Sequence, residues 1–295
     1  MAHSRRDFLK TSIAATMLGG LSGTAAHAAA KRSATDWVTL GRSGVKVTRL
    51  GFGTGTFSGR VQRELGQEEF TRLVRYAYDN GIRFFETAQS YGGMHQMLGV
   101  ALKGLPRDSY RVMTKMTMRP DMDATAMIDK FRTEMQMDYF DILLLHYMHN
   151  PDWYGSLERQ RDEFSEAKSK KVILSKGASV HGLPTLRTFP GNKWLDIAMI
   201  RMNHRGTKMD AEDFNTNGLG DVSEVVQHAK KVHTEGMGVI SMKLAGEGQF
   251  TSREDRQKAL KFAFGTGAVD TVTIGYKNTG EIDEAIENLN LALKA

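Results

Sequence analysis

From Trp37 onward, short apolar runs alternate with longer amphipathic stretches, and this alternation limits the possible folds more than any other feature. Runs such as residues 142–145 contain no polar residue, which is typical of strands covered on both faces in a parallel sheet. Alternation over about 250 residues predicts an α/β protein and favours a single (β/α)8 TIM barrel. The expected strands are residues 47–53, 83–87, 110–115, 140–146, 171–179, 195–203, 238–243 and 268–275, and the expected helices are residues 67–80, 124–137, 157–169, 222–235, 253–264 and 281–294.

A doubly wound sheet is the alternative arrangement for such a pattern. That fold usually has a Gly-x-Gly-x-x-Gly turn that leads from the first strand directly into a helix. Here the glycine-rich run 51–55 follows the first expected strand, but no helical pattern begins at once. The barrel is therefore the preferred interpretation.

The first 28 residues resemble a bacterial twin-arginine signal peptide. Arg5 and Arg6 lie in the run Ser-Arg-Arg-Asp-Phe-Leu-Lys, a modest apolar stretch follows at 11–21, and Ala-His-Ala at 26–28 provides small residues for cleavage. The resemblance implies export to the periplasm by the twin-arginine translocation machinery. The apolar stretch is too short for a stable membrane anchor. We expect a signal at 1–28, a linker at 29–36 and the barrel at 37–295.

Composition excludes several classes of function. The net charge is +6, and it falls to +4 without residues 1–28. No basic stripe with interleaved aromatic residues is present, so nucleic acid is not an expected partner. The absence of cysteine excludes disulfides, thiolate nucleophiles and cysteine-bound metals. The chain has 17 methionines; a copper site is conceivable, but core packing explains them more simply, and no metal is expected.

Three consecutive expected strands end in residues that suit proton transfer to a carbonyl group. Glu86 ends the second strand, Tyr91 follows in the same loop, Lys115 ends the third strand and His146 ends the fourth. Carboxyl ends of barrel strands meet at one face, so these side chains are expected to lie together. A phenol can donate a proton, and a nearby ammonium is expected to lower its pKa. An imidazole can hold the substrate carbonyl.

These residues carry a resemblance to the aldo-keto reductase superfamily. The segments 50–55, 86–92, 98–102, 114–115 and 144–146 are similar to that family's opening strand and to its tyrosine, lysine and histidine segments. The resemblance implies that Tyr91 is the general acid/base, that Lys115 and Glu86 tune it, and that His146 orients a small-molecule carbonyl substrate. Glu86 stands where the family usually has aspartate. The sequence gives no indication of oligomeric state.

The same resemblance implies a nicotinamide cofactor, NADP(H) in the first place and NAD(H) as the alternative. The chain departs from the family at Val180 and Met199, where amide side chains usually hold the carboxamide. Met242 takes the place of an aromatic residue that stacks on the nicotinamide. The expected cofactor-binding residues are Gly53, Thr54, Ser179, Arg201, Asn203, Met242, Lys243, Gly275 and Lys277.

Two further functions fit parts of the pattern. The altered carboxamide positions would suit a non-catalytic or regulatory binding barrel. A lyase or hydrolase could use Lys115 as a Schiff-base former, or His146, without a nucleotide. A lyase or hydrolase of this kind would have no evident role for Glu86 and Tyr91.

Overall fold

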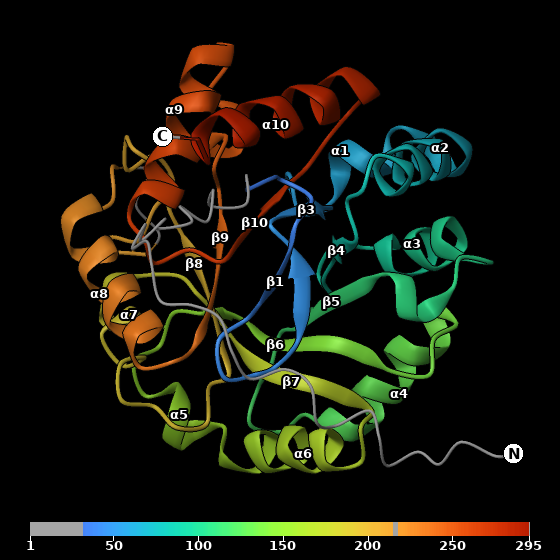
Figure 1. Cartoon of the computed structure of the whole chain (residues 1–295). Coiled ribbons are helices and arrows are strands. Elements are labelled where there is room, and N and C mark those ends of the chain that lie inside the picture. The colour runs from blue at the N-terminus through green and yellow to red at the C-terminus, as the bar shows by residue number, and fades with distance from the viewer. Residues whose placement is uncertain (1–31, 215–217, 295) are drawn as a thin grey trace, which may run out of the picture. The chain divides into compact units, whose positions relative to one another are not determined.

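The computed structural model describes residues 32–214 and 218–294. The expected export signal at 1–28 lies outside these residues. Within the described part, eight parallel strands form a closed barrel in the order β10-β3-β4-β5-β6-β7-β8-β9, with helices around it (Figure 1). This confirms the expected (β/α)8 fold. The barrel strands are β3 Leu50–Gly53, β4 Phe84–Glu86, β5 Arg111–Met116, β6 Phe140–Met148, β7 Ile173–Val180, β8 Ile197–Arg201, β9 Gly238–Met242 and β10 Thr271–Ile274.

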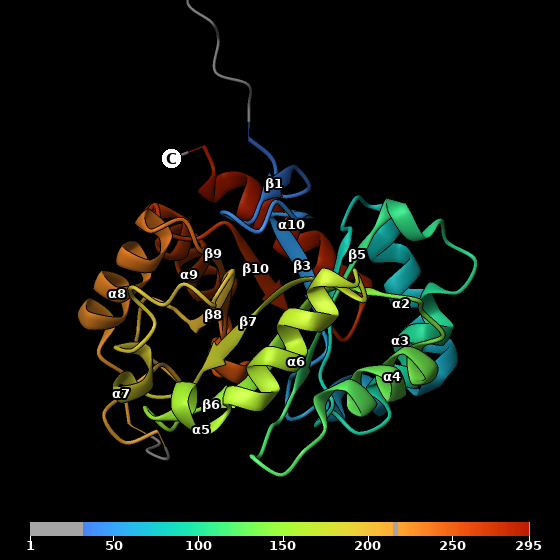
Figure 2. The same ribbon diagram turned by 90° about the horizontal axis from the view of Figure 1, so that it is seen from below.

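The first expected strand, 47–53, is in fact two strands. Its beginning, β2 (Lys46–Thr48), pairs antiparallel with β1 (Trp37–Thr39), and only β3 enters the barrel. Leu40 and Val47 of this hairpin are fully buried, where they pack with the side chains that fill the barrel interior. The hairpin therefore closes one end of the barrel, where β1 is seen in Figure 2.

All six expected helices are present. The helices that cover the barrel are α2 Gly66–Asp79, α3 Met94–Leu102, α4 Ala124–Met135, α6 Glu158–Ser169, α8 Val222–Thr234, α9 Arg253–Gly265 and α10 Thr279–Ala292, and shorter turns are α1 Arg60–Arg63, α5 Trp153–Ser156 and α7 Leu183–Leu186. Four of them, α4, α8, α9 and α10, begin after an Asp, Ser or Asn side chain that accepts a backbone N–H of the first turn. No helix in the described ranges is long and apolar enough to span a membrane.

The structure shows one helix that was not predicted, α3, and one connection without a long helix, where none was predicted. Helix α3 was missed because its sequence is largely apolar and lacks a polar face, and it packs so closely on α4 that a Cβ on Gly99 would lie 2.6 Å from the carbonyl oxygen of Met135. Between β7 and β8 the chain forms only the single turn α7. Pro190 follows shortly after that turn, and proline does not support continuation of a helix.

Candidate active site

A buried ion pair forms the base of the site. Glu86, the last residue of β4, accepts a hydrogen bond from the Lys115 ammonium of β5, and the same ammonium donates to the carbonyl oxygen of Thr87 at 2.8 Å. The Lys115 and Glu86 side chains are only 1% and 4% exposed, so the two charges depend on each other. Gly53 of β3 leaves room for the carboxylate, because a Cβ there would lie 3.0 Å from Glu86 Oε2.

Tyr91 packs directly on this pair. The Lys115 ammonium lies 4.9 Å from the centre of the Tyr91 ring. The phenol oxygen lies so close to the backbone that a Cβ on Gly55 would be 2.6 Å from it. Burial and the charge of Glu86 raise the pKa of Tyr91 well above 10. This is opposite to the direction expected from the sequence, because burial and the nearby Glu86 carboxylate both disfavour the phenolate.

His146 completes the group. Its ring centre lies 5.6 Å from that of Tyr91, with the two rings nearly perpendicular. Burial and the charges of Lys115 and Lys243 hold the pKa of His146 well below its usual value, so the ring is neutral at pH 7. The Nδ1 atom lies 3.2 Å from the hydroxyl oxygen of Ser90. If Ser90 donates this hydrogen bond, Nε2 carries the proton and can donate it to a ligand.

Ser90 was missed in the sequence analysis. It precedes Tyr91 in the β4–α3 loop, where small polar residues are common and carry little signal. Only the fold brings it to His146, which is 56 residues further along the chain.

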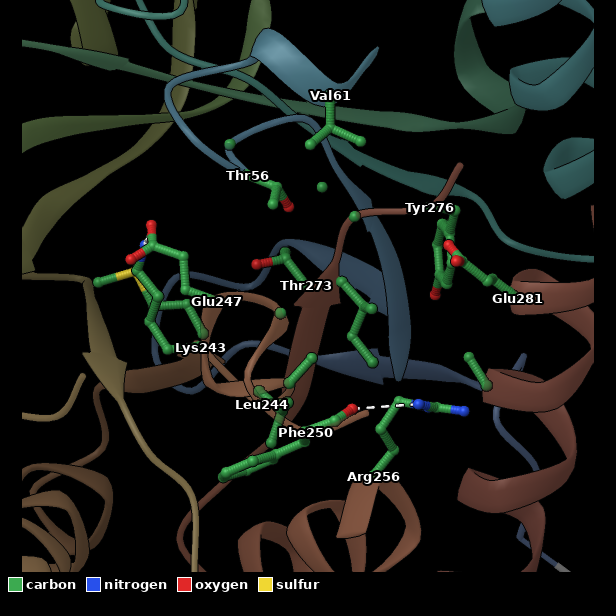
Figure 3. A pocket seen from close by; sticks show the side chains of 18 of the residues that line it. Thr56, Val61, Lys243, Leu244, Glu247, Phe250, Arg256, Thr273, Tyr276 and Glu281 are labelled. Carbon is green, nitrogen blue, oxygen red and sulfur yellow. Dashed lines mark hydrogen bonds and ion pairs between the residues drawn. The ribbon is translucent and has the colours of Figure 1, made fainter. Parts of the chain in front are cut away.

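A cavity of about 550 Å³ is lined by Glu86 and Tyr91 and extends to α9 and α10. Figure 3 shows part of its lining, including Lys243, Arg256 and Glu281. Ligand sites in proteins commonly have volumes of this order. Five of the nine expected cofactor residues line it: Gly53, Met242, Lys243, Gly275 and Lys277. Gly275 is required there, because a Cβ would lie 2.6 Å from the Thr56 hydroxyl oxygen.

Thr54 and Ser179 do not line the cavity, and their side chains make backbone contacts. The Thr54 hydroxyl donates to the carbonyl oxygen of Glu86 at 3.0 Å, which fixes the end of β4. The Ser179 hydroxyl oxygen accepts the backbone N–H of Tyr147 at 3.1 Å. Both side chains are fully buried.

Arg201 and Asn203 are likewise engaged within the protein. Arg201 forms a buried ion pair with Asp210, with Nη2 2.6 Å from Oδ1. The Asn203 amide donates to the carbonyl oxygens of Thr207 at 2.7 Å and Lys243 at 3.2 Å. These contacts shape the loops after β8 and β9, so the structure does not bring Arg201 and Asn203 into the cavity.

Polar residues that were not expected from the sequence also line the cavity. Glu247, in the loop after β9, lies beside Lys243, whereas Arg256, Glu281, Glu284 and Asn288 come from helices α9 and α10. In sequence they look like the solvated residues of amphipathic helices. Their common orientation toward one cavity follows only from the packing of α9 against α10.

The chain was compared with known proteins. The model of the aldo/keto reductase family matches residues 49–263. Probable aldo-keto reductase 1 of Glycine max is 30% identical over 158 residues, which are 48% of this chain and 45% of that protein. L-galactose dehydrogenase of Arabidopsis thaliana is 34% identical over 157 residues, which are 49% of this chain and 48% of that protein. The chain thus spans about half the length of the curated relatives it matches.

The fold is shared with solved structures. The aldo-keto reductase AKR11C1 from Bacillus halodurans superposes with a TM-score of 0.68 at 16% identity, covering 88% of this chain and 95% of that one. The family match extends from the first barrel strand into α9 and includes Glu86, Tyr91, Lys115 and His146. The chain therefore belongs to the aldo/keto reductase family.

Proposed function

We propose that this protein is an NAD(P)H-dependent oxidoreductase that reduces an aldehyde or ketone to the alcohol, or catalyses the reverse reaction. The observation that carries the proposal is that Glu86 and Tyr91 line one end of a cavity of about 550 Å³. Lys115 and His146 lie directly behind them, in contact with Glu86 and Tyr91 respectively. A proton donor and a neutral imidazole side by side suit a carbonyl group.

The cavity fits a nicotinamide dinucleotide in its chemistry. Gly53 and Gly275 expose backbone to the cavity, the Met242 thioether offers an apolar surface, and Lys243 and Lys277 provide polar groups. When bound there, the nicotinamide would supply the hydride.

The protein's own residues would hold the carbonyl and move one proton. Neutral His146 would donate a hydrogen bond to the carbonyl oxygen, and Tyr91 would transfer its phenolic proton to the oxygen as negative charge develops. Because the pKa of Tyr91 is raised, the phenol keeps its proton at neutral pH. The phenol is therefore in the form that can donate a proton to a carbonyl oxygen.

The test is the Tyr91→Phe variant, assayed with a panel of aldehydes and ketones and with both nucleotides. Loss of the proton donor should lower kcat by about a hundredfold or more, with nucleotide affinity unchanged. Tyr76→Phe is the matched control, since the Tyr76 hydroxyl bonds Asp283 at 2.8 Å on the surface. Unchanged turnover by the Tyr91 variant would refute the assigned role.

A binding barrel without catalysis is the second candidate. The observation in its favour is that Arg201 and Asn203 are engaged by Asp210 and by backbone carbonyls, which leaves them unavailable to a carboxamide. Saturable nucleotide binding with no turnover of any carbonyl compound would support this candidate, and turnover would exclude it.

We also propose that residues 1–28 direct export through the twin-arginine machinery, that 29–36 form a linker and that the barrel works in the periplasm. The Arg5-Arg6 pair in its full motif supports this. Cell fractionation should find the protein in the periplasm, and replacing both arginines with lysine should retain it in the cytoplasm. Nucleotide that co-purifies with the periplasmic protein would show that the cofactor is carried out already bound.

A further inference from the structure

At the α10 end of the cavity, Arg256 is fully engaged by groups of the protein. Its Nε and Nη2 donate to the two carboxylate oxygens of Glu284 at 2.6 and 2.8 Å. Its Nη1 donates to the carbonyl oxygens of Thr251 at 2.7 Å and Phe250 at 3.1 Å, and Figure 3 shows the contact with Phe250. This two-point pairing lowers the pKa of Glu284, so the carboxylate is charged at neutral pH. The guanidinium is therefore already neutralised.

Among the described residues, the other two cations that line this cavity also have carboxylate partners that line it. Lys243 Nζ lies 2.7 Å from Glu247 Oε1. Lys277 Nζ lies 3.8 Å from Glu281 Oε1, and the backbone N–H of Lys277 donates to Glu281 Oε2 at 2.8 Å. The Lys277 pair is exposed and therefore weak, but it places the Glu281 carboxylate beside the lysine.

We infer that the site binds NAD(H) more tightly than NADP(H), and that Glu281 and Glu284 determine this preference. The inference rests on the proposed function, because it assumes that hydride transfer places the nicotinamide beside Tyr91. The opposite, adenosine end of the dinucleotide then reaches the α10 end of the cavity. A carboxylate accepts hydrogen bonds from a ribose 2′-hydroxyl, whereas it repels a 2′-phosphate that lacks a free cation.

The family resemblance implied NADP(H) as the first choice of cofactor. The carboxylates that accompany the cations of the cavity favour NAD(H) instead. A 2′-phosphate carries nearly two negative charges and is bound best by arginine or lysine side chains that do not already face a carboxylate. In the described cavity it would meet Glu281 and Glu284, with Arg256 already bound. Like charges placed together in an interface are strongly unfavourable.

The test is a fluorescence titration of the full chain with NADH and with NADPH, together with calorimetry of ADP-ribose and 2′-phospho-ADP-ribose. These last two ligands lack the nicotinamide and report the adenosine end alone. We expect NADH to bind at least about tenfold more tightly than NADPH. For the same reason, ADP-ribose should bind more tightly than 2′-phospho-ADP-ribose.

Two variants assign the effect to residues. In Glu284→Gln and Glu281→Gln the carboxylates lose their charge, which leaves Arg256 and Lys277 free to meet a phosphate. The preference for NADH should fall about tenfold or reverse. Glu287→Gln is the matched control, because Glu287 lies on the same helix and pairs with Arg253 outside the cavity.

The outcomes separate the two proposals. Equal or tighter binding of NADPH and of the 2′-phospho fragment by the native protein would overturn the inference while leaving the oxidoreductase intact. A preference for NADH that survives both variants would overturn the role of these carboxylates. Failure of a folded protein to bind any of the four ligands would overturn the proposed function, and the inference with it.

Discussion

Replacing Lys115 with methionine should destabilise the barrel strongly. The substitution keeps most of the apolar stem but leaves the Glu86 carboxylate, 4% exposed, without its counter-ion. It also removes the hydrogen bond from the ammonium to the carbonyl oxygen of Thr87 at 2.8 Å. Removing one partner of a buried ion pair costs about 3–5 kcal/mol of the free energy of unfolding.

The loss should be measured by urea unfolding followed by circular dichroism, together with the melting temperature. At about 2–4 °C per kcal/mol for a chain of this size, we expect Tm to fall by roughly 6–20 °C. The double variant Lys115→Met/Glu86→Gln should recover most of the stability, because no buried charge is then left alone. It should not recover carbonyl reduction.

Lys176→Met is the control for this experiment. Lys176 is also a buried lysine, but its ammonium donates to the carbonyl oxygen of Trp194, and Asp196 nearby keeps Lys168 as its own partner at 2.5 Å. Its loss should therefore be much smaller. A Lys115→Met variant within about 1 kcal/mol of the native protein, or a double variant less stable than the single one, would refute the reasoning.

Three further results are expected. Reduction should show no alkaline decline up to about pH 10, because the pKa of Tyr91 is raised, and a rate that falls between pH 7 and 9 would contradict that shift. It should show no acid decline near pH 6.5, because the pKa of His146 is lowered, and a rate that falls from pH 7 to pH 6 would contradict that shift. Ser90→Ala should lower kcat more than it changes KM, because the hydrogen bond that sets the His146 tautomer is lost, and the melting temperature should stay nearly unchanged. Values of kcat and KM equal to those of the native protein would exclude this positioning role. Gly177→Ala should cost about 3 kcal/mol or more, because its Cβ would collide with the carbonyl oxygen of Ile197 on the neighbouring strand, and a native-like urea midpoint would count against that packing.

Several predictions from sequence hold because local chemistry decides them. Apolar runs without polar alternation are typical of strands covered on both faces, and each of the eight expected strands contributes a strand to the barrel, the first one only with its second half, β3. The closure of parallel strands forces their carboxyl ends to one face, which is why Glu86, Lys115 and His146 could be expected near Tyr91 before any coordinates were known.

Other features depend on contacts between residues far apart in the chain. The sequence shows a lysine near a tyrosine and suggests a lowered phenol pKa, but burial and the paired Glu86 charge reverse that direction. Arg201 and Asn203 are plausible ligands by pattern, yet the loops after β8 and β9 supply their partners.

By itself the sequence determined the barrel, the order of its elements and which strands end in chemically useful side chains, because periodicity and strand polarity are local properties. Only the tertiary structure decided which charges meet. The pairing of Arg256 with Glu284 links helices α9 and α10 across 28 residues, and nothing in either helix alone predicts it. Electrostatic energy depends on distances and burial in three dimensions, so the charge state and selectivity of the cavity emerge only when the chain is folded.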